Sequence, residues 1–250
     1  MTHPTRPKKI RIDHILVNRQ LAPSRERAQS YILAGKVWVE GKPVKKASET
    51  FLPDSSVELK GEDHPYVSRG GVKLEGALRD FQWEVKGKVF LDLGASTGGF
   101  TDCLLQKGAQ KVYAVDVGYG QLDWKLRQDP RVVVKEKTHM KDLKKSDFKE
   151  EIHHAVVDVS FISLLKVLPF LLKILSSPCD VLLLIKPQFE AGKDEVPKGG
   201  VIQDENQRIE IVQKVLAGIK GLGLEIVGYY PSTIRGTEGN QEYFALVKKE

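Results

Sequence analysis

A short apolar stretch that breaks into a glycine-rich turn and then continues as a helix-like segment constrains the fold of this chain more than any other feature. The apolar stretch covers residues 88–91, the turn covers 92–100 and the helical pattern covers 101–107. Glycine lets a backbone approach a ligand closely, and the first turn of a helix presents free N–H groups. This strand–turn–helix unit predicts an α/β fold that binds a nucleotide-like ligand at the end of a strand.

The spacing within the turn distinguishes between nucleotide ligands. It is not the G-x-G-x-x-G of dinucleotide folds, and no Lys-Ser/Thr pair follows as in a phosphate-binding loop. Instead, Asp92 stands two residues before the first glycine, and an ionised carboxylate there needs a cationic or hydrogen-bond-donating group nearby. An aminoacyl group meets this need and a phosphate does not, so the turn predicts a site for S-adenosylmethionine. The expected contacts are Asp92, Gly94, Ala95, Ser96, Thr97, Gly98, Gly99 and Phe100.

A second acid follows at the spacing expected for an adenosine-containing ligand. Asp116 ends another apolar stretch, residues 112–115, and is placed to accept hydrogen bonds from a ribose diol. The next residue, Val117, is expected to contact the same ligand. A helix cap or turn residue is the alternative interpretation of Asp116. The two acids and the glycines distinguish a methyltransferase from a dehydrogenase only in part.

The surrounding residues predict how the chain is organised. From about residue 68 onward, apolar stretches alternate with helical patterns, and continuous apolar strands indicate a sheet covered on both faces. We therefore predict a Rossmann-like parallel α/β sandwich that ends in an antiparallel strand. Strands are expected at residues 89–93, 112–115, 132–134, 155–159, 181–185, 226–230 and 243–247. Helices are expected at residues 74–80, 100–107, 163–175 and 205–219.

A smaller basic module precedes this sheet. Helical spacing at residues 11–18, a helix capped by Ser24 that ends near Gly35, a hairpin-like turn at 40–42 and a final strand at 56–59 predict a small α+β unit. We predict domains at residues 1–60 and 68–250, joined by a linker at 61–67.

The residues of this module resemble the αL RNA-binding domain of a ribosomal small-subunit protein, pseudouridine synthases and a tyrosyl-tRNA synthetase. The resemblance is carried by residues 11–16, 24–28, 32–39 and 41–44. It implies RNA as the partner, and basic side chains on a helix face and its last turn are suited to RNA phosphates. The expected RNA contacts are Arg11, Arg25, Arg27, Lys36 and Arg69.

Four charged residues stand where apolar surroundings would otherwise continue. Asp158 and Lys186 each end an apolar strand, Glu242 opens the last strand, and Lys73 lies at the start of the first helix of the larger domain. Each could be an ordinary ion-pair partner. Charges at one rim of a sheet, beside a cofactor loop, also suit the activation of a weak nucleophile.

In this order, the four residues match the Lys-Asp-Lys-Glu tetrad of the FtsJ-like RNA ribose 2′-O-methyltransferases, and the whole chain resembles the TlyA family. The shared phrases are residues 66–74, 91–100, 115–122, 158–163, 186–192 and 239–243. The resemblance implies that Lys186 orients or deprotonates a ribose hydroxyl and that Glu242 orients Lys73 or the hydroxyl. Asp158 is expected to hold Lys186 and also to contact the cofactor. One departure concerns the adenine contact, since this chain has His139 where the family usually has Asn.

Composition narrows the remaining classes. Lys and Arg number 39 against 33 acids, a mild basic excess that is compatible with nucleic acid. The two cysteines lie in apolar surroundings, no secretory signal is visible, and residues 162–175 are too short and too charged to span a bilayer. The six histidines are scattered, so no metal is expected.

We therefore expect a cytoplasmic S-adenosylmethionine-dependent ribosomal RNA 2′-O-methyltransferase. Its expected partner is ribosomal RNA or a ribosomal subunit, and neither DNA nor a membrane is expected as a partner. The alternatives are a membrane-active, haemolysin-like protein that uses residues 162–175 and an RNA-binding protein with an inactive methyltransferase domain. The sequence leaves open the target nucleotide, the ribosomal subunit and the oligomeric state.

Overall fold

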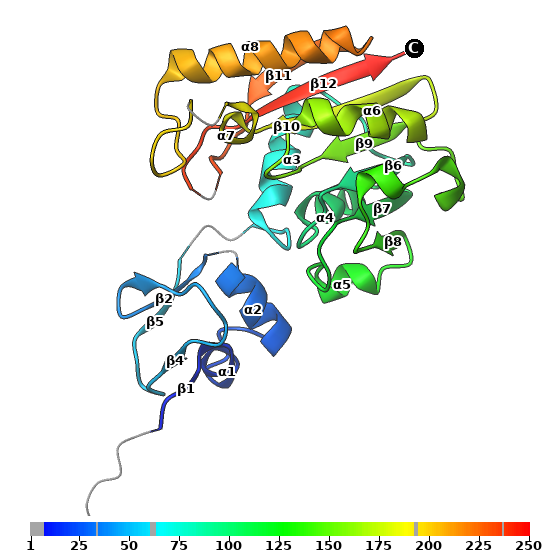
Figure 1. Cartoon of the computed structure of the whole chain (residues 1–250). Helices are drawn as coiled ribbons and strands as arrows, with labels where there is room; N and C mark the ends of the chain where they lie inside the picture. The colour runs from blue at the N-terminus through cyan, green and yellow to red at the C-terminus, as the bar shows by residue number, and fades with distance from the viewer. Residues whose placement is uncertain (1–7, 34, 61–63, 193–194, 237) are drawn as a thin grey trace, which may run out of the picture. The chain divides into compact units, whose positions relative to one another are not determined.

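The computed structural model describes residues 8–33, 35–60, 64–192, 195–236 and 238–250. The chain divides into two compact units, Met1–Arg69 and Gly70–Glu250 (Figure 1). Residues 61–63 of the expected linker lie outside the described residues.

The N-terminal unit combines two helices with short strands. Ser24 caps the second helix as expected, because its Oγ accepts a hydrogen bond from the Arg27 N–H at 3.2 Å. Glu40 and Gly41 both have positive φ, as a two-residue hairpin turn requires. The sequence did not predict the antiparallel pairing of Ile10–Arg11 with Thr50–Phe51. The elements are β1 (Ile10–Arg11), α1 (Ile12–Asn18), α2 (Arg25–Leu33), β2 (Val37–Val39), β3 (Lys42–Pro43), β4 (Thr50–Phe51) and β5 (Val57–Leu59).

The C-terminal unit is built on a seven-stranded sheet in the order β11-β12-β10-β9-β6-β7-β8. Strands β8, β7, β6, β9 and β10 run parallel, and β12 is inserted antiparallel between β10 and β11. The chain starts in the middle at β6, moves outward to β8, and then returns to β9, so the strand order reverses between β6 and β9. This confirms the predicted sheet. The strands are β6 (Val89–Leu93), β7 (Lys111–Val115), β8 (Val132–Lys135), β9 (His154–Val157), β10 (Cys179–Ile185), β11 (Glu225–Pro231) and β12 (Tyr243–Lys249).

Helices cover both faces of this sheet (Figure 1). The first begins at Arg69, five residues before the predicted start, because Gly70 and Gly71 continue the helix rather than break it. Lys73 therefore lies inside the helix and not at its start. The helices are α3 (Arg69–Asp80), α4 (Gly99–Gln106), α5 (Trp124–Arg127), α6 (Leu164–Ile174), α7 (Pro187–Glu190) and α8 (Glu205–Gly221), with 3₁₀ turns η1 (Met140–Asp142) and η2 (Lys145–Asp147).

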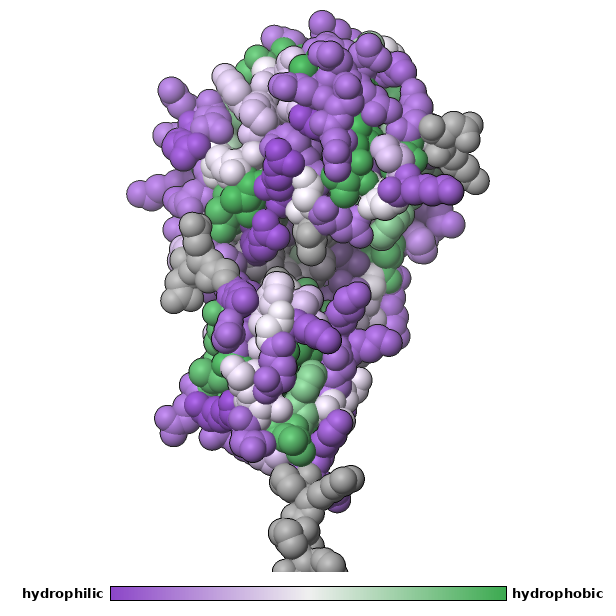
Figure 2. Space-filling model, turned by 90° about the vertical axis from the view of Figure 1, so that its left-hand side faces the viewer, coloured by the Kyte–Doolittle hydropathy of each residue, from purple (hydrophilic) through white to green (hydrophobic). Residues whose placement is uncertain are grey.

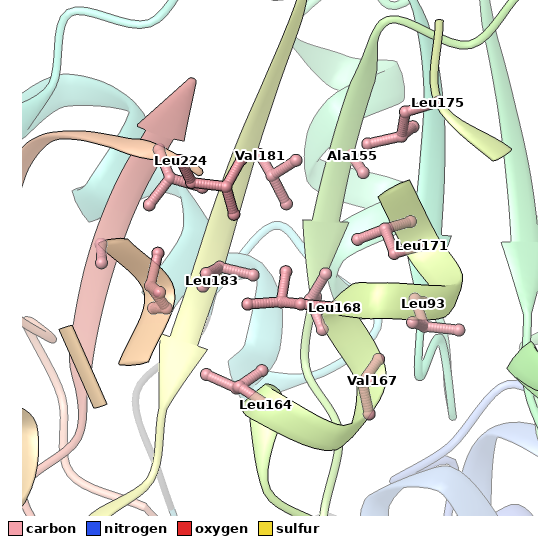
Figure 3. Packing of buried hydrophobic residues seen from close by; sticks show 14 of the residues in the cluster. Leu93, Ala155, Leu164, Val167, Leu168, Leu171, Leu175, Val181, Leu183 and Leu224 are labelled. Carbon is pink, nitrogen blue, oxygen red and sulfur yellow. The ribbon is translucent and has the colours of Figure 1, made fainter. Parts of the chain in front are cut away.

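The apolar segment at residues 162–175 forms α6, which contributes to the core. Leu164, Leu168 and Leu171 are buried against Ala155 of β9 and Leu183 of β10 in one cluster (Figure 3). Ser163 caps the helix, since its Oγ accepts a hydrogen bond from the Leu165 N–H. The apolar face of α6 is thus occupied by the sheet.

None of the helices in the described part of the chain is long and apolar enough to cross a membrane.

One face of the molecule is largely hydrophilic. Figure 2 shows hydrophilic residues over most of one face, with apolar residues gathered in small patches.

Both cysteines, Cys103 and Cys179, are free and buried, as their apolar surroundings predicted.

The packing of α6 predicts how two substitutions on the same helix differ. Leu168 has no exposed surface and Phe170 is 40% exposed. Leu168→Ala would leave a cavity between α6 and the sheet and is expected to lower the free energy of unfolding by about 2–5 kcal/mol. Phe170→Ala, the control, is expected to cost clearly less. Chemical denaturation followed by circular dichroism measures both, and equal losses would contradict the packing described.

Candidate active site

Adjacent strand ends bring the predicted charged residues to one rim of the sheet. Ile185 of β10 pairs with Tyr243 of β12, so Lys186 and Glu242 are the next residues at this edge. On the other side of β10, Leu183 pairs with Val157, the residue before Asp158. The Asp158 N–H donates to the carbonyl of Leu93 at 2.9 Å, which places Asp158 beside the start of the glycine-rich turn.

Two lysine–carboxylate ion pairs occupy this rim. Lys73 Nζ lies 2.5 Å from Glu242 Oε2, and Lys186 Nζ lies 2.5 Å from Asp158 Oδ1. The side chains are 11% and 4% exposed in the first pair and 10% and 22% in the second. Separating either pair would leave a charge in a largely desolvated place, so each pair holds its partners firmly.

Further side chains surround Lys186. Its Nζ donates to Ser160 Oγ at 2.9 Å and lies 5.8 Å from the centre of the Phe189 ring. Phe161 contacts Phe189 at 4.7 Å between ring centres, is 89% exposed and has a φ of +63°. A large apolar side chain held out into solvent on an unfavourable backbone is a feature of binding sites rather than of packing.

The glycine-rich turn fits tightly against its neighbours. Gly94 has a φ of +86°, and a Cβ atom there would lie 2.2 Å from the carbonyl oxygen of Asp158. At Gly98, with a φ of +92°, a Cβ would lie 2.2 Å from Leu126 and 2.7 Å from Leu122. The positive φ favours glycine at both positions, and at Gly94 the rigid backbone of Asp158 also leaves no space for a side chain.

Asp92 is buried beneath this turn. It has no exposed surface, and its Oδ2 accepts a 2.6 Å hydrogen bond from Thr101 Oγ1 of α4. Its Oδ1 has no hydrogen-bond partner among the described residues. Burial, with smaller contributions from the nearby Asp158 and Asp116, raises the pKa of Asp92 to about 7 against the opposing effect of the Thr101 hydrogen bonds.

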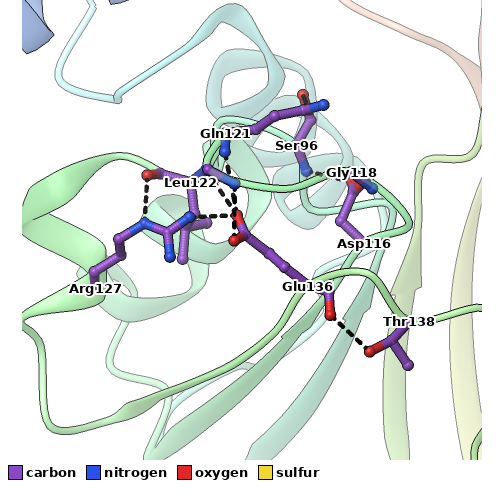
Figure 4. Close-up of polar contacts among 9 residues, drawn as sticks. Ser96, Asp116, Gly118, Gln121, Leu122, Arg127, Glu136 and Thr138 are labelled. Carbon is purple, nitrogen blue, oxygen red and sulfur yellow. Dashed lines mark hydrogen bonds and ion pairs between the residues drawn. The ribbon is translucent and has the colours of Figure 1, made fainter.

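Asp116 links the turn to the loop that follows β7. Its Oδ2 accepts from the Ser96 N–H at 2.8 Å, and its Oδ1 accepts from the Gly118 N–H at 2.7 Å (Figure 4). It therefore closes a turn, the alternative that the sequence left open. Each oxygen keeps a second lone pair, so the same carboxylate retains capacity to accept from a ligand.

The other predicted cofactor contacts differ in exposure. Ser96, Val117 and His139 are exposed, and Val117 is 61% exposed despite its apolar side chain. Thr97 is half-buried, and Ala95 and Gly99 are buried. Phe100 is 3% exposed, with its ring 6.0 Å from that of Phe244, so it packs between α4 and the sheet.

In the N-terminal unit, one buried acid holds two of the predicted RNA-binding arginines. Asp13 has no exposed surface and accepts from Arg11 Nε at 3.0 Å, from Arg25 Nη2 at 3.2 Å and from Gln29 Nε2 at 3.0 Å. The guanidinium of Arg11 holds the pKa of Asp13 far below its usual range, against the effect of burial. Both arginine side chains stay more than 40% exposed, so the cluster presents net positive charge.

The remaining predicted RNA contacts lie on two helices and a turn. The Arg27 guanidinium lies 5.0 Å from the centre of the Tyr31 ring, and Lys36 Nζ lies 6.0 Å from it. Arg69 is the first residue of α3 and is half-buried.

Sequence analysis missed several residues of the rim and its loops. Ser160 and Phe161 stand within the phrase that contains Asp158, but nothing in their types signalled a role. Glu136 lies between Lys135 and Lys137, a pattern typical of a solvated loop, yet its side chain is 8% exposed. Among the described residues, no group of three or more His, Cys, Asp or Glu could hold a metal ion.

The fold and its rim define a class of protein. The strand order and the glycine-rich turn after β6 are those of a methyltransferase fold, and the sequence profile of the FtsJ-like methyltransferases matches residues 66–249. The S4 domain profile matches residues 10–57. The chain belongs to the FtsJ-like methyltransferase family and, within it, to the TlyA and hemolysin A group that joins this domain to an S4 domain.

Relatives cover nearly the whole chain. The 16S/23S rRNA (cytidine-2′-O)-methyltransferase TlyA of Mycobacterium tuberculosis is 44% identical over 97% of this chain and 91% of its own length. Hemolysin A of Brachyspira hyodysenteriae is 44% identical over 94% and 98%, respectively. A solved structure from Streptococcus thermophilus, whose name proposes a hemolysin, has a TM-score of 0.75 and 41% identity over 96% of this chain and 88% of that one.

The contact at Gly94 predicts a specific sensitivity. In Gly94→Ala the new methyl group would meet the backbone of Asp158, which cannot move aside as a flexible side chain would. We expect a loss of roughly 2 kcal/mol or more in unfolding free energy. Gly120→Ala is the control. Gly120 also has a positive φ of +69°, but a Cβ atom added there would meet no other atom within 4 Å. Thermal melting compares them, and equal losses would show that only backbone conformation matters.

The pKa of Asp92 predicts a pH-dependent stability. Its folded pKa of about 7 lies above the ordinary aspartate value of 3.8, so between these values the folded state holds a proton that the unfolded state has lost. The stability contributed by this group is therefore present below pH 3.8 and is lost as pH rises toward 7.

Asn cannot ionise, so Asp92→Asn does not lose stability in this way as the pH rises. The free energy of unfolding of the variant minus that of the native protein should therefore be higher at pH 8 than at pH 5. Between pH 5 and pH 8 this difference should change by roughly 2.5 kcal/mol, because about two of the pH units between the unfolded and folded pKa values lie above pH 5. Denaturant unfolding of both proteins at both pH values measures it. A constant difference between the proteins would mean that Asp92 ionises normally.

Proposed function

We propose that this protein transfers the methyl group of S-adenosylmethionine to a ribose 2′-hydroxyl of ribosomal RNA. The observation that carries the proposal is the pair of lysine–carboxylate contacts at the sheet rim, next to a glycine-rich turn that begins at Gly94. Relatives that share 44% of the sequence carry the name of this activity. An S4 domain on the same chain supports RNA as the substrate.

The residues present fit such a cofactor. The buried Oδ1 of Asp92 has no hydrogen-bond partner among the described residues, so this carboxyl beneath the turn can accept from a cationic aminoacyl group, whose charge would favour the ionised form. Asp116 has free lone pairs for a ribose diol, and the exposed Val117 offers an apolar surface to the base. The exposed His139 follows β8 at the position of the expected adenine contact. When bound, the cofactor supplies an electrophilic methyl group on a positively charged sulfur.

This chain's own residues prepare the nucleophile. Asp158 and Ser160 fix the Lys186 ammonium group, which then orients the ribose hydroxyl or helps to remove its proton as the oxygen attacks. Glu242 fixes Lys73 at the same rim and keeps its charge in place. Much of the acceleration comes from holding the attacking oxygen in line with the methyl group. Phe161, exposed next to this rim, is suited to stack on a base of the substrate.

We assign RNA binding to residues 1–60, with 61–67 as the linker and 68–250 as the catalytic domain. The S4 profile and the arginines around Asp13 support the first assignment. A ribosomal substrate implies action in the cytoplasm. The alternative of an inactive methyltransferase domain has no support, because all four charged residues form their pairs.

Removal of Lys186 tests the proposal. Purified protein, isotopically labelled S-adenosylmethionine and ribosomal subunits should yield alkali-resistant 2′-O-methylated nucleotides. Lys186→Ala should reduce the rate by about 10²-fold or more, because the group that holds the hydroxyl is gone. Lys173→Ala, an exposed lysine on α6, should keep native activity.

Two outcomes would contradict the proposal in different ways. Unchanged methyl transfer by Lys186→Ala would refute the role of Lys186. Cofactor binding without labelled ribosomal RNA from any subunit or assembly intermediate would refute the substrate.

A further inference from the structure

The loop between β7 and α5 packs against the glycine-rich turn. Ser96 Oγ donates to Gln121 Oε1 at 3.3 Å, and the Asp123 N–H donates to the carbonyl of Thr97 at 3.1 Å. Leu122 and Leu126 occupy the space that a side chain at Gly98 would need. The position of residues 116–123 therefore sets the position of the turn at residues 94–98.

The carboxylate of Glu136 is hydrogen-bonded to the backbone of this loop. Glu136 Oε2 accepts from the Gly120 N–H at 2.9 Å, and Oε1 accepts from the N–H groups of Gln121 at 3.1 Å and Leu122 at 3.4 Å (Figure 4). Arg127 donates to the same oxygen and, through Nε, to the carbonyl of Leu122 at 3.0 Å.

Glu136 is suited to act as an ionised clamp. Its side chain is 8% exposed, and burial alone would raise its pKa. The hydrogen bonds from Gly120, Arg127 and Leu122 outweigh burial and lower the pKa below its usual value. The group is therefore an anion at neutral pH, and three consecutive backbone N–H groups converge on it. A Cβ atom built at Gly120 would meet nothing within 4 Å, so the loop is not tightly packed there and the Glu136 hydrogen bonds restrain it.

We propose that Glu136 is a positioning residue for S-adenosylmethionine, which acts by fixing the loop of residues 116–122 so that Asp116 and Ser96 meet the adenosine part of the cofactor. The inference rests on the proposed function, since it takes S-adenosylmethionine as the ligand. Glu136 contacts the loop and does not belong to the rim with Lys186, so it affects cofactor binding rather than the methyl-transfer step.

The test compares two substitutions of the same kind in the full-length chain. Glu136→Gln replaces one acceptor oxygen by an amide that donates, opposite backbone N–H groups that also donate. Glu150→Gln is the matched control, since Glu150 is likewise a glutamate with several donors, the side chains of Lys111 and Tyr113, but lies at the amino end of β7. Titration calorimetry with S-adenosylmethionine and S-adenosylhomocysteine should show Kd values raised roughly tenfold in Glu136→Gln and unchanged in Glu150→Gln.

Kinetics separate positioning from general damage. In Glu136→Gln the KM for S-adenosylmethionine should rise with the Kd, and kcat at saturating cofactor should stay within about twofold of native. Amide hydrogen exchange should become faster in residues 118–122 and stay unchanged in α6. If Glu136→Gln fails to fold, Arg127→Gln carries the test, because it removes one partner of Glu136 and the bond to Leu122 and should raise Kd in the same direction.

Each result has one meaning. Native Kd and KM in a folded Glu136→Gln, or equal losses in Glu150→Gln, would overturn the role of Glu136. A fall in kcat with unchanged Kd would also overturn it. If the native protein binds the cofactor but methylates no ribosomal RNA, the proposed function fails, while the effect of Glu136 on Kd is still measured.

Discussion

The absence of a side chain at Gly94 is the constraint on which the rest of the rim depends. The strand order reverses between β6 and β9, so the connections that follow these two strands lead to opposite halves of the sheet. An alanine at residue 94 would bring its Cβ within 2.2 Å of the Asp158 carbonyl. Because glycine stands there, the turn that holds a ligand and the strand end that carries Asp158 lie side by side. The Lys186 pair then follows from the register of β9 and β10.

The ion pairs at this rim serve a purpose other than stability. Desolvating a lysine and a carboxylate offsets much of their attraction, and a well-packed apolar pair would stabilise the sheet at least as well. Here both pairs lie at the rim of the sheet, near the glycine-rich turn and the exposed Phe161. In the function that we propose, charges held at this rim by fixed partners orient a polar group of the substrate. The cost in folding free energy is accepted where chemistry needs the charge.

The sequence predicts the sheet well because burial on both faces leaves a direct signal. Continuous apolar stretches such as residues 181–185 can only be central strands, and the charged residue that follows each stretch marks the rim. The start of α3 was misplaced because Gly70 and Gly71 usually interrupt helices, and packing overrides that tendency here. Short pairings such as β1 with β4 have two residues each, too few to show a period.

The roles of Glu136 and Asp13 could not be predicted from the sequence, and the physical reason is the same for both. Glu136 and Asp13 stand among basic residues in the sequence, where an acid normally faces solvent. In the structure each is buried and gathers donors from elsewhere, with Glu136 fixing a loop and Asp13 aligning Arg11 and Arg25. Charge pattern alone cannot reveal this, because the donors of Glu136 are mainly backbone N–H groups, which every sequence has. Buried carboxylates thus fix local structure in both units, where Glu136 holds the loop that follows β7 and Asp13 aligns the arginines of the S4 domain.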